Sequence, residues 1–165
     1  MSVSATLDSY LTRKAGKYDT VIHAHTTSAT DSALQSNIPL KQMAKGVVLH
    51  DQDHYMMAVI PAMNKVALTQ VEEVIGRPAV LAKETEIERL FKDCEPGAVP
   101  AIGQAYGLNV VWDDSLMEDA DLYLEAGDHR HLIHLTRDQF NKLMRKNPHG
   151  TISCAPEDLH DMRYS

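Results

Sequence analysis

Two apolar segments on either side of a short polar turn restrict the fold of this chain more than any other feature. Residues 43–50 and 54–62 are rich in valine, methionine and other apolar residues, and Asp51-Gln52-Asp53 lies between them. This pattern predicts a β-hairpin with a tight turn at 51–53. The hairpin side chains that we expect in the core are Val47, Val48, Met57, Val59 and Ile60.

The rest of the chain mixes helical and extended patterns. Helices are predicted at residues 5–14, 28–36, 69–75, 85–91 and 137–145, and strands at 18–24, 78–81, 108–112, 121–126 and 131–135. Because the two kinds of element do not alternate regularly, a doubly wound sheet does not fit. We predict an α/β (α+β) fold in which helices surround a curved, mixed, barrel-like β-sheet, as a single domain over residues 1–146. Residues 147–165 are polar and predict an irregular C-terminal tail.

Local signals mark several helix ends. Residues 69–72, 115–118 and 136–139 match the capping box, a Ser or Thr followed three residues later by Glu or Gln. Gly76 predicts the end of the helix that begins near residue 69.

The composition is that of an ordinary globular domain, with 44% apolar and 24% charged residues among 165. A net charge of −7 argues against tight non-specific binding to DNA or RNA, although a local basic rim is compatible with it. The candidates for such a rim are Lys41, Lys45, Lys65, Arg130 and residues 142–146. Two cysteines, an N-terminus unlike a signal peptide and the lack of a long apolar run predict a reducing, cytoplasmic location and no membrane partner.

Lys45 is the first candidate site residue. It precedes Gly46 in an otherwise apolar strand, and a glycine there lets a ligand or another backbone come close. A lysine at the wall of a cleft can bind a phosphate or polarise a carbonyl by its charge. A solvent-facing lysine is the alternative.

The loop Glu95-Pro96-Gly97-Ala98-Val99-Pro100 is the second candidate. Its glycine reaches backbone conformations that are closed to other residues, and its prolines stiffen the chain. Such a loop can present backbone N–H groups in a fixed direction, as a developing oxyanion requires. A plain connecting loop is the alternative.

The nine histidines raise the question of a metal site. His23 and His25 would share one face of a predicted strand, and His129 and His131 would do the same in an extended segment. No H-E-x-x-H motif or cysteine pair completes a ligand set, so we expect no metal. Cys94 has no linked histidine base, and we expect it to be a small buried residue rather than a nucleophile.

An ordered set of segments resembles the YbaK-type deacylases and the insertion domain of bacterial prolyl-tRNA synthetases. It begins with Ala44-Lys45-Gly46-Val47-Val48 and the hairpin end Ala58-Val59-Ile60-Pro61-Ala62. The 95–100 loop follows, and then residues 110–116 and 122–127. The resemblance spans residues 18–143.

This resemblance implies a trans-editing hydrolase that removes a wrong amino acid from tRNA by cleaving the ester at the terminal adenosine. Lys45 would be the catalytic lysine, which orients the adenosine end or its phosphate. The attacking water would be helped by the ribose hydroxyl of the substrate, so no metal or cofactor is implied. The implied partners are the 3′ end of aminoacyl-tRNA and an aminoacyl-tRNA synthetase. The predicted substrate-binding residues are His25, Gly97, Ala98, Val99, Pro100, Gly127 and His129.

Some positions depart from the usual family pattern. Glu125 stands where a small polar residue is common, Gly46 stands where Ser or Thr often follows the lysine, and residues 128–131 are more charged. These departures bear on which acyl group is removed. Two alternatives remain: a non-catalytic module that binds an aminoacyl or nucleotide group or a synthetase, and a hydrolase of another small acyl ester.

Overall fold

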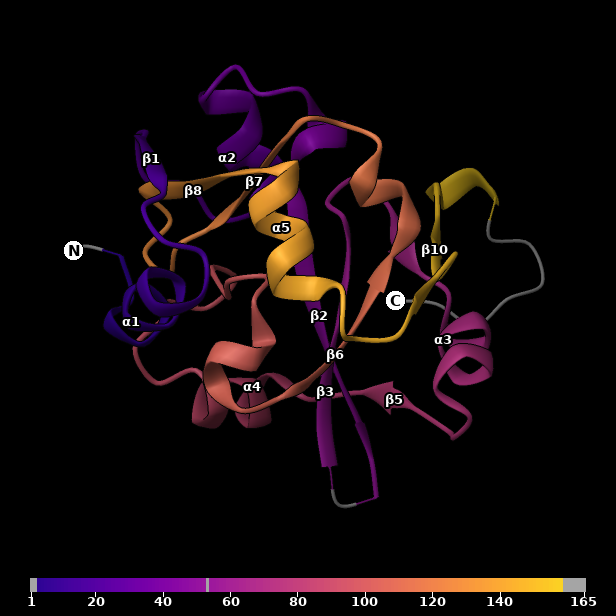
Figure 1. Ribbon diagram of the computed structural model, residues 1–165. Helices are drawn as coiled ribbons and strands as arrows, with labels where there is room; N and C mark the ends of the chain where they lie inside the picture. The colour runs from indigo at the N-terminus through magenta and orange to yellow at the C-terminus, as the bar shows by residue number, and fades with distance from the viewer. Residues whose placement is uncertain (1–2, 53, 159–165) are drawn as a thin grey trace.

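The β2–β3 hairpin is the centre of the structure, a computed structural model that describes residues 3–52 and 54–158 (Figure 1). β2 (Ala44–Asp51) and β3 (His54–Pro61) pair antiparallel along their whole length, which confirms the predicted hairpin. Asp53, in the predicted turn, lies outside the described residues.

The hairpin separates two apolar layers because side chains of a strand alternate between its faces. Val48, Met57 and Val59 belong to the larger cluster, which also holds Trp112 and Phe140. Ile60 belongs to the second cluster, and the half-buried Val47 packs against it. All five core positions predicted from the hairpin sequence are therefore confirmed.

Three strands extend the hairpin into a five-stranded sheet of order β5-β2-β3-β6-β9. β5 (Val80–Leu81) pairs antiparallel with the end of β2, whereas β6 (Asn109–Asp113) and β9 (His149–Gly150) add in parallel. A second, antiparallel sheet has the order β1-β8-β7. Its strands are β1 (Asp19–Ile22), β8 (His131–Thr136) and β7 (Asp121–Glu125).

A parallel bridge between Met43 and Tyr123 connects these two sheets. The described strands form no closed barrel, so the barrel-like part of the prediction is not confirmed, whereas the mixed α+β single domain is. Figure 1 shows α1 and α3 on opposite sides of the hairpin.

In the described part of the chain five α-helices surround the sheets, each within one residue of its predicted ends. They are α1 (Ala5–Lys14), α2 (Ala29–Gln35), α3 (Leu68–Ile75), α4 (Glu84–Leu90) and α5 (Arg137–Met144). No helix in the described part of the chain is long and apolar enough to cross a membrane.

The helix ends confirm one predicted capping box. Thr136 accepts a hydrogen bond from the Gln139 N–H, and the Gln139 side chain accepts one from the Thr136 N–H. Gly76 ends α3 in the left-handed region, at φ 75°, as predicted.

The two other predicted capping boxes are wrong. α3 begins at Leu68, so its N-cap is Ala67, which has no capping side chain, and Thr69 lies inside the helix. The Glu72 carboxylate accepts a hydrogen bond from the Ala79 N–H. At residues 114–117 the cap is Asp113, whose carboxylate accepts from the Ser115 N–H at 2.9 Å.

Asp113 also orders the segment that follows residue 147, which was predicted to be irregular. Its second carboxylate oxygen accepts hydrogen bonds from the Ile152 N–H at 3.0 Å and the Ser153 hydroxyl at 2.8 Å. β10 (Ser153–Cys154) pairs with β4 (Lys65–Val66), and β9 joins the main sheet. Residues 149–154 are therefore structured, Pro156–Asp158 form a 3-10 turn, and residues 159–165 of the predicted tail lie outside the described residues.

Replacing Asp113 by alanine should destabilise the protein by about 2–4 kcal/mol, because the donors that it satisfies lose a charged acceptor. Urea unfolding followed by circular dichroism measures this, and limited proteolysis reports whether residues 149–154 detach. Asp114→Ala is the matched control, since Asp114 is half-exposed and contacts only His149 among the described residues. Equal effects of the two substitutions would contradict the assigned role of Asp113.

Candidate active site

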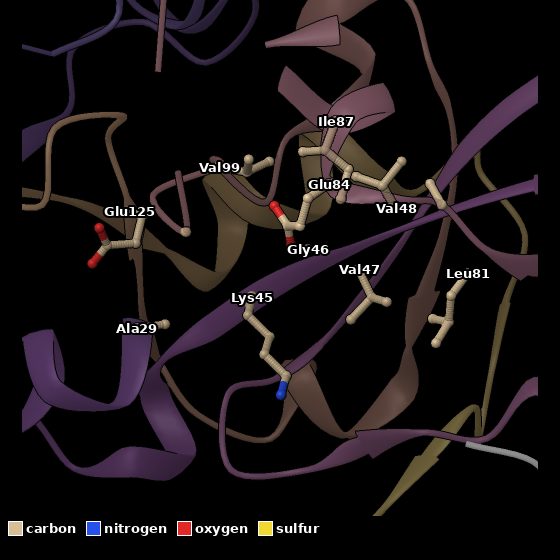
Figure 2. Close-up of a pocket in the computed structure, with 12 residues that line it drawn as sticks. Ala29, Lys45, Gly46, Val47, Val48, Leu81, Glu84, Ile87, Val99 and Glu125 are labelled. Atoms are coloured by element: carbon tan, nitrogen blue, oxygen red, sulfur yellow. The ribbon is translucent and has the colours of Figure 1, made fainter. Parts of the chain in front are cut away.

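A cavity of about 350 Å³ opens where the free edge of β2 faces the 95–100 loop, the end of β7 and α4 (Figure 2). Its lining residues are Ala29, Lys45, Gly46, Val47, Val48, Leu81, Ala82, Glu84, Ile87, Gly97, Val99 and Glu125. The fold thus brings Lys45 and the predicted loop to one cavity from distant parts of the sequence.

Lys45 is a half-buried cation without a counter-charge. Burial, and to a smaller degree the nearby charge of Lys65, lower the pKa of the Lys45 amine. No carboxylate in the described residues lies within ion-pair distance of this amine. Figure 2 shows the side chain leaving β2 with its nitrogen directed away from Glu84 and Glu125. An anionic group of a ligand could therefore pair with this amine.

The edge of β2 offers backbone hydrogen-bonding groups beside Lys45. The Val48 carbonyl accepts from the Ala82 N–H at 3.0 Å, so the backbone groups of Val48 point toward β5. Alternate residues of a strand point to the same edge, which directs the N–H and C=O of Gly46 toward the cavity. Among the described residues neither group has a hydrogen-bond partner on this edge, because β5 pairs only with Leu49 and His50.

Gly46 itself is explained by packing. A Cβ at this position would overlap the thioether of Met57 beneath the sheet. The sulfur occupies the space that a Ser or Thr side chain would need.

The 95–100 loop is held in shape by backbone hydrogen bonds at its start and across its turn. The Glu95 N–H donates to the Gly127 carbonyl at 2.7 Å, and the Ala98 N–H donates to the Glu95 carbonyl at 3.0 Å. Gly97 takes φ 79° between them, which suits glycine because it has no Cβ. Gly97 and Val99 face the cavity, whereas Ala98 and Pro100 are buried beneath it.

His129, which lies between β7 and β8, holds the same loop through a hydrogen bond to its backbone. Its Nε2 lies 2.6 Å from the Pro96 carbonyl, and because a carbonyl can only accept, this nitrogen carries the proton. The ring reaches this place because His129 adopts a left-handed backbone, φ 58°, after Gly127 at φ 108°. The corner is stabilised by Asp128, which accepts hydrogen bonds from the N–H groups of Arg130 and His131.

Glu125 is buried between this corner and the cavity. Its carboxylate lies 3.2 Å from His129 Nδ1, and both side chains are 3% exposed. Burial raises the pKa of Glu125 to about 7, against opposing contributions from Ser32 and His129. An acidic side chain that is part-protonated at neutral pH therefore lines the cavity.

The structure corrects the expected pairing of histidines. β1 ends at Ile22, so His23 and His25 lie in a loop and do not share a strand face. The left-handed backbone of His129 likewise removes it from the face of His131. In residues 3–52 and 54–158, no group of three or more His, Cys, Asp or Glu is arranged to hold a metal ion.

Cys94 is partly buried away from the cavity and touches Tyr106 and Asp93. Burial is the largest cause that raises the pKa of its thiol to about 12, so it carries little thiolate at neutral pH. This agrees with the expectation of a small structural residue.

Comparison with known proteins agrees with this arrangement of fold and cavity. A family model described as the aminoacyl-tRNA editing domain matches residues 23–143. The chain belongs to this family. No curated protein matches the sequence significantly.

Solved structures show the same fold as this editing domain. A proposed trans-editing enzyme for prolyl tRNA synthetase is 20% identical, with a TM-score of 0.80 over 94% of this chain and 99% of the other. The hypothetical protein APE2540 is 16% identical, with a TM-score of 0.79 over 90% and 99%. A proposed signal transduction protein from Marinobacter aquaeolei VT8 is 16% identical, with a TM-score of 0.77, and the match covers 96% of this chain but 32% of the other.

The predicted site residues of the editing domain fall into two groups. Lys45, Gly97 and Val99 line the cavity. Ala98, Pro100, Gly127 and His129 do not line it but support the loop, and His25 braces the loop from outside through its contact with Glu95 at 3.0 Å.

Glu125 was not among the predicted site residues and stood out in the sequence only as a departure from the family pattern. Its signal was an acidic residue at the end of an apolar strand, directly before Ala126-Gly127. Ala29, Glu84 and Ile87 were also missed, because they lie on the helices α2 and α4 without a recognisable motif.

The stability of the wild-type protein should fall as pH rises from about 4.5 to about 7. The unfolded carboxyl of Glu125 loses its proton near 4.5, whereas the folded one keeps it until about 7, so deprotonation favours the unfolded state over this interval. The fall should be on the order of 3 kcal/mol, since one pKa unit corresponds to about 1.4 kcal/mol. Urea unfolding as a function of pH measures it; Glu125→Gln should remove the fall and the exposed control Glu88→Gln should keep it.

Gly97→Ala should destabilise the protein more than Gly16→Ala. Both glycines have φ between 77° and 79°, but a Cβ at Gly16 meets nothing within 4 Å, whereas one at Gly97 lies 3.1 Å from the Thr27 carbonyl. The backbone cost of about 1 kcal/mol is common to both, and only Gly97 adds crowding at the cavity. Chemical unfolding of both variants separates the two effects, and equal losses would show that the loop tolerates a side chain.

Proposed function

We propose that this editing domain is a trans-editing hydrolase that deacylates mischarged aminoacyl-tRNA. The observation that carries the proposal is the shared cavity, which Lys45 and the rigid loop around Gly97 both line beside the free edge of β2. The Lys45 amine has no carboxylate within ion-pair distance among the described residues. Family membership supports the substrate class. The catalytic unit would comprise residues 1–146, and its place of action would be the cytoplasm, where tRNA is charged.

In this proposal Lys45 binds a phosphate at the 3′ end of the tRNA through its charge. The backbone N–H groups of Gly97, Val99 and Gly46 orient the ester carbonyl. The oxygen of a water molecule attacks the carbonyl carbon, the bond between this carbon and the ribose oxygen breaks, and the ribose oxygen takes up a proton. The resemblance to the YbaK-type deacylases implies that a ribose hydroxyl of the substrate assists the water, so that the protein supplies binding, orientation and electrostatics.

The partner implied by the chemistry is the aminoacylated 3′ end of tRNA. The fold neighbour named for prolyl tRNA synthetase suggests that synthetase as a second partner of the editing domain. A net charge of −7 limits contact with the tRNA body to local basic groups.

Lys45→Ala should lower kcat/KM for deacylation by about 100-fold, because a charged contact of a few kcal/mol is lost. The measurement is release of amino acid from alanyl-, seryl-, threonyl- and cysteinyl-tRNA carrying mismatched anticodons. Lys41→Ala is the matched control, since Lys41 is exposed, pairs with Asp119 and lies outside this cavity. Wild-type protein that releases none of these amino acids would overturn the proposal, and an unaltered Lys45→Ala rate would overturn the role of the lysine.

A non-catalytic binding module is the second candidate. Glu84 and Glu125 give the cavity two carboxylates beside one lysine, a set that suits recognition as well as hydrolysis. Saturable binding of aminoacyl-tRNA without release of the amino acid, abolished by Lys45→Ala, would favour this function over deacylation.

A further inference from the structure

Three side chains join the N-cap of α1 to the chain just before the 95–100 loop. The Ser4 hydroxyl donates to one carboxylate oxygen of Asp93 at 2.7 Å, and the Tyr106 hydroxyl donates to the other at 2.8 Å. The Thr6 N–H donates to Asp93 as well, at 3.2 Å. The limited burial of this carboxyl raises its pKa, but the hydrogen bonds outweigh burial and lower the pKa to about 2. We call Ser4, Asp93 and Tyr106 the Asp93 clasp.

Ser4 also holds the corner between β7 and β8. Its backbone N–H donates to the Ala126 carbonyl at 2.8 Å. Glu95, two residues after Asp93, donates its own N–H to the neighbouring Gly127 carbonyl at 2.7 Å. The N-cap of α1 is therefore hydrogen-bonded both to the segment that leads into the loop and to the corner against which the loop lies.

Close packing at Gly127 brings these segments together. A Cβ at this position would lie 3.2 Å from the Ser4 Cβ and 3.2 Å from the Cys94 sulfur, closer than ordinary van der Waals contact. Its φ of 108° is also one that glycine reaches more easily than other residues. Because residue 127 has no side chain, the N-cap, the corner and the chain before the loop can pack directly against one another.

The clasp lies behind the cavity and is anchored in the core. None of its three side chains lines the cavity, whereas Gly97 and Val99, a few residues after Asp93, do. The Tyr106 ring packs against Phe91, with 4.5 Å between ring centroids, and both rings belong to the larger apolar cluster. The clasp can therefore act on a bound ligand only through the loop that it holds.

We infer that the Asp93 clasp is a set of positioning residues that fixes the 95–100 loop against the β7–β8 corner, with the N–H groups of Gly97 and Val99 in place for the ester carbonyl. This inference rests on the proposed function. Displacing an orienting group by about 1 Å can cost on the order of 100-fold in rate. Ser4 and α1 precede the residues 23–143 that match the family model, and the clasp makes them a working part of the site.

The test compares Asp93→Ala and Tyr106→Phe with wild-type protein. Both substitutions should lower kcat for deacylation about 10-fold and change KM by less than about 2-fold, because Lys45 still binds the tRNA end while the loop no longer orients the ester. The Glu95 and Ala98 N–H groups, whose hydrogen bonds shape the loop, should exchange with solvent about 10-fold faster in both variants. Steady-state kinetics and hydrogen exchange followed by NMR measure the two effects.

Two controls separate positioning from general stability. Tyr18→Phe removes the same kind of bond, a tyrosine hydroxyl that donates to Asp8, away from the cavity, and should leave kcat and loop exchange unchanged. Asp113→Ala removes hydrogen bonds distant from the loop, and at a temperature where it stays folded it should keep the wild-type kcat. A loss of kcat in Asp113→Ala equal to that in Asp93→Ala would show a general effect of stability and overturn the inference.

The outcomes also separate this inference from the proposed function. Wild-type protein that deacylates aminoacyl-tRNA, together with an unchanged kcat in both clasp variants, would overturn the clasp and leave the proposed function intact, whether or not loop exchange becomes faster. A change confined to KM would do the same. Wild-type protein without deacylase activity would overturn both. Tyr106→Phe keeps Asp93 and Ser4, so it decides the question even where Asp93→Ala does not fold.

Discussion

The site depends on one unequal pairing: β2 is fully hydrogen-bonded to β3 on one edge and only partly covered by β5 on the other. An exposed strand edge usually invites association with another chain, and proteins cover such edges with loops, helices or charges. Here the 95–100 loop and α4 face the uncovered part of β2 without pairing with it. A cavity of about 350 Å³ lies between β2 and these two elements. The same geometry that leaves the outer edge of Gly46 unpaired therefore shields its backbone groups from other chains and leaves them beside the cavity.

The second condition is a backbone corner that few residues tolerate. Between β7 and β8 the chain turns through Gly127 and a left-handed His129, and Asp128 stabilises the turn with two backbone hydrogen bonds. A left-handed backbone at a residue other than glycine costs free energy, and it persists only where the surrounding contacts enforce that conformation. The corner places one imidazole against both the loop carbonyl of Pro96 and the carboxylate of Glu125, so the loop and the buried acid are coupled through a single ring.

Features that depend on local sequence could be predicted, and features that depend on distant contacts could not. The hairpin, the core position of Met57 and the cap at Thr136 follow from alternation and capping patterns within a few residues. The predicted cap at residue 69 is wrong because α3 already begins at Leu68, and the carboxylate of Glu72 accepts from the Ala79 N–H, a contact that no capping pattern contains. The ordered segment near Ile152 was missed for the same reason, since its partner Asp113 is about forty positions away.

The candidate site shows the same division. Lys45 and Gly97 were predicted as site residues from the order of segments that the chain shares with the family. No rule of sequence spacing would have placed these two residues at one site. Glu125 was hidden because an acidic residue at a strand end usually faces water, and only the packing of His129, Ser32 and the cavity wall shows that it does not. The overall charge of −7 did not predict the electrostatics of the site. These depend on the few charged groups that line the cavity and on how far those groups are shielded from solvent. Lys45 is half-buried with no carboxylate within ion-pair distance among the described residues, and Glu125 is buried beside His129, whatever the sign of the surface around them.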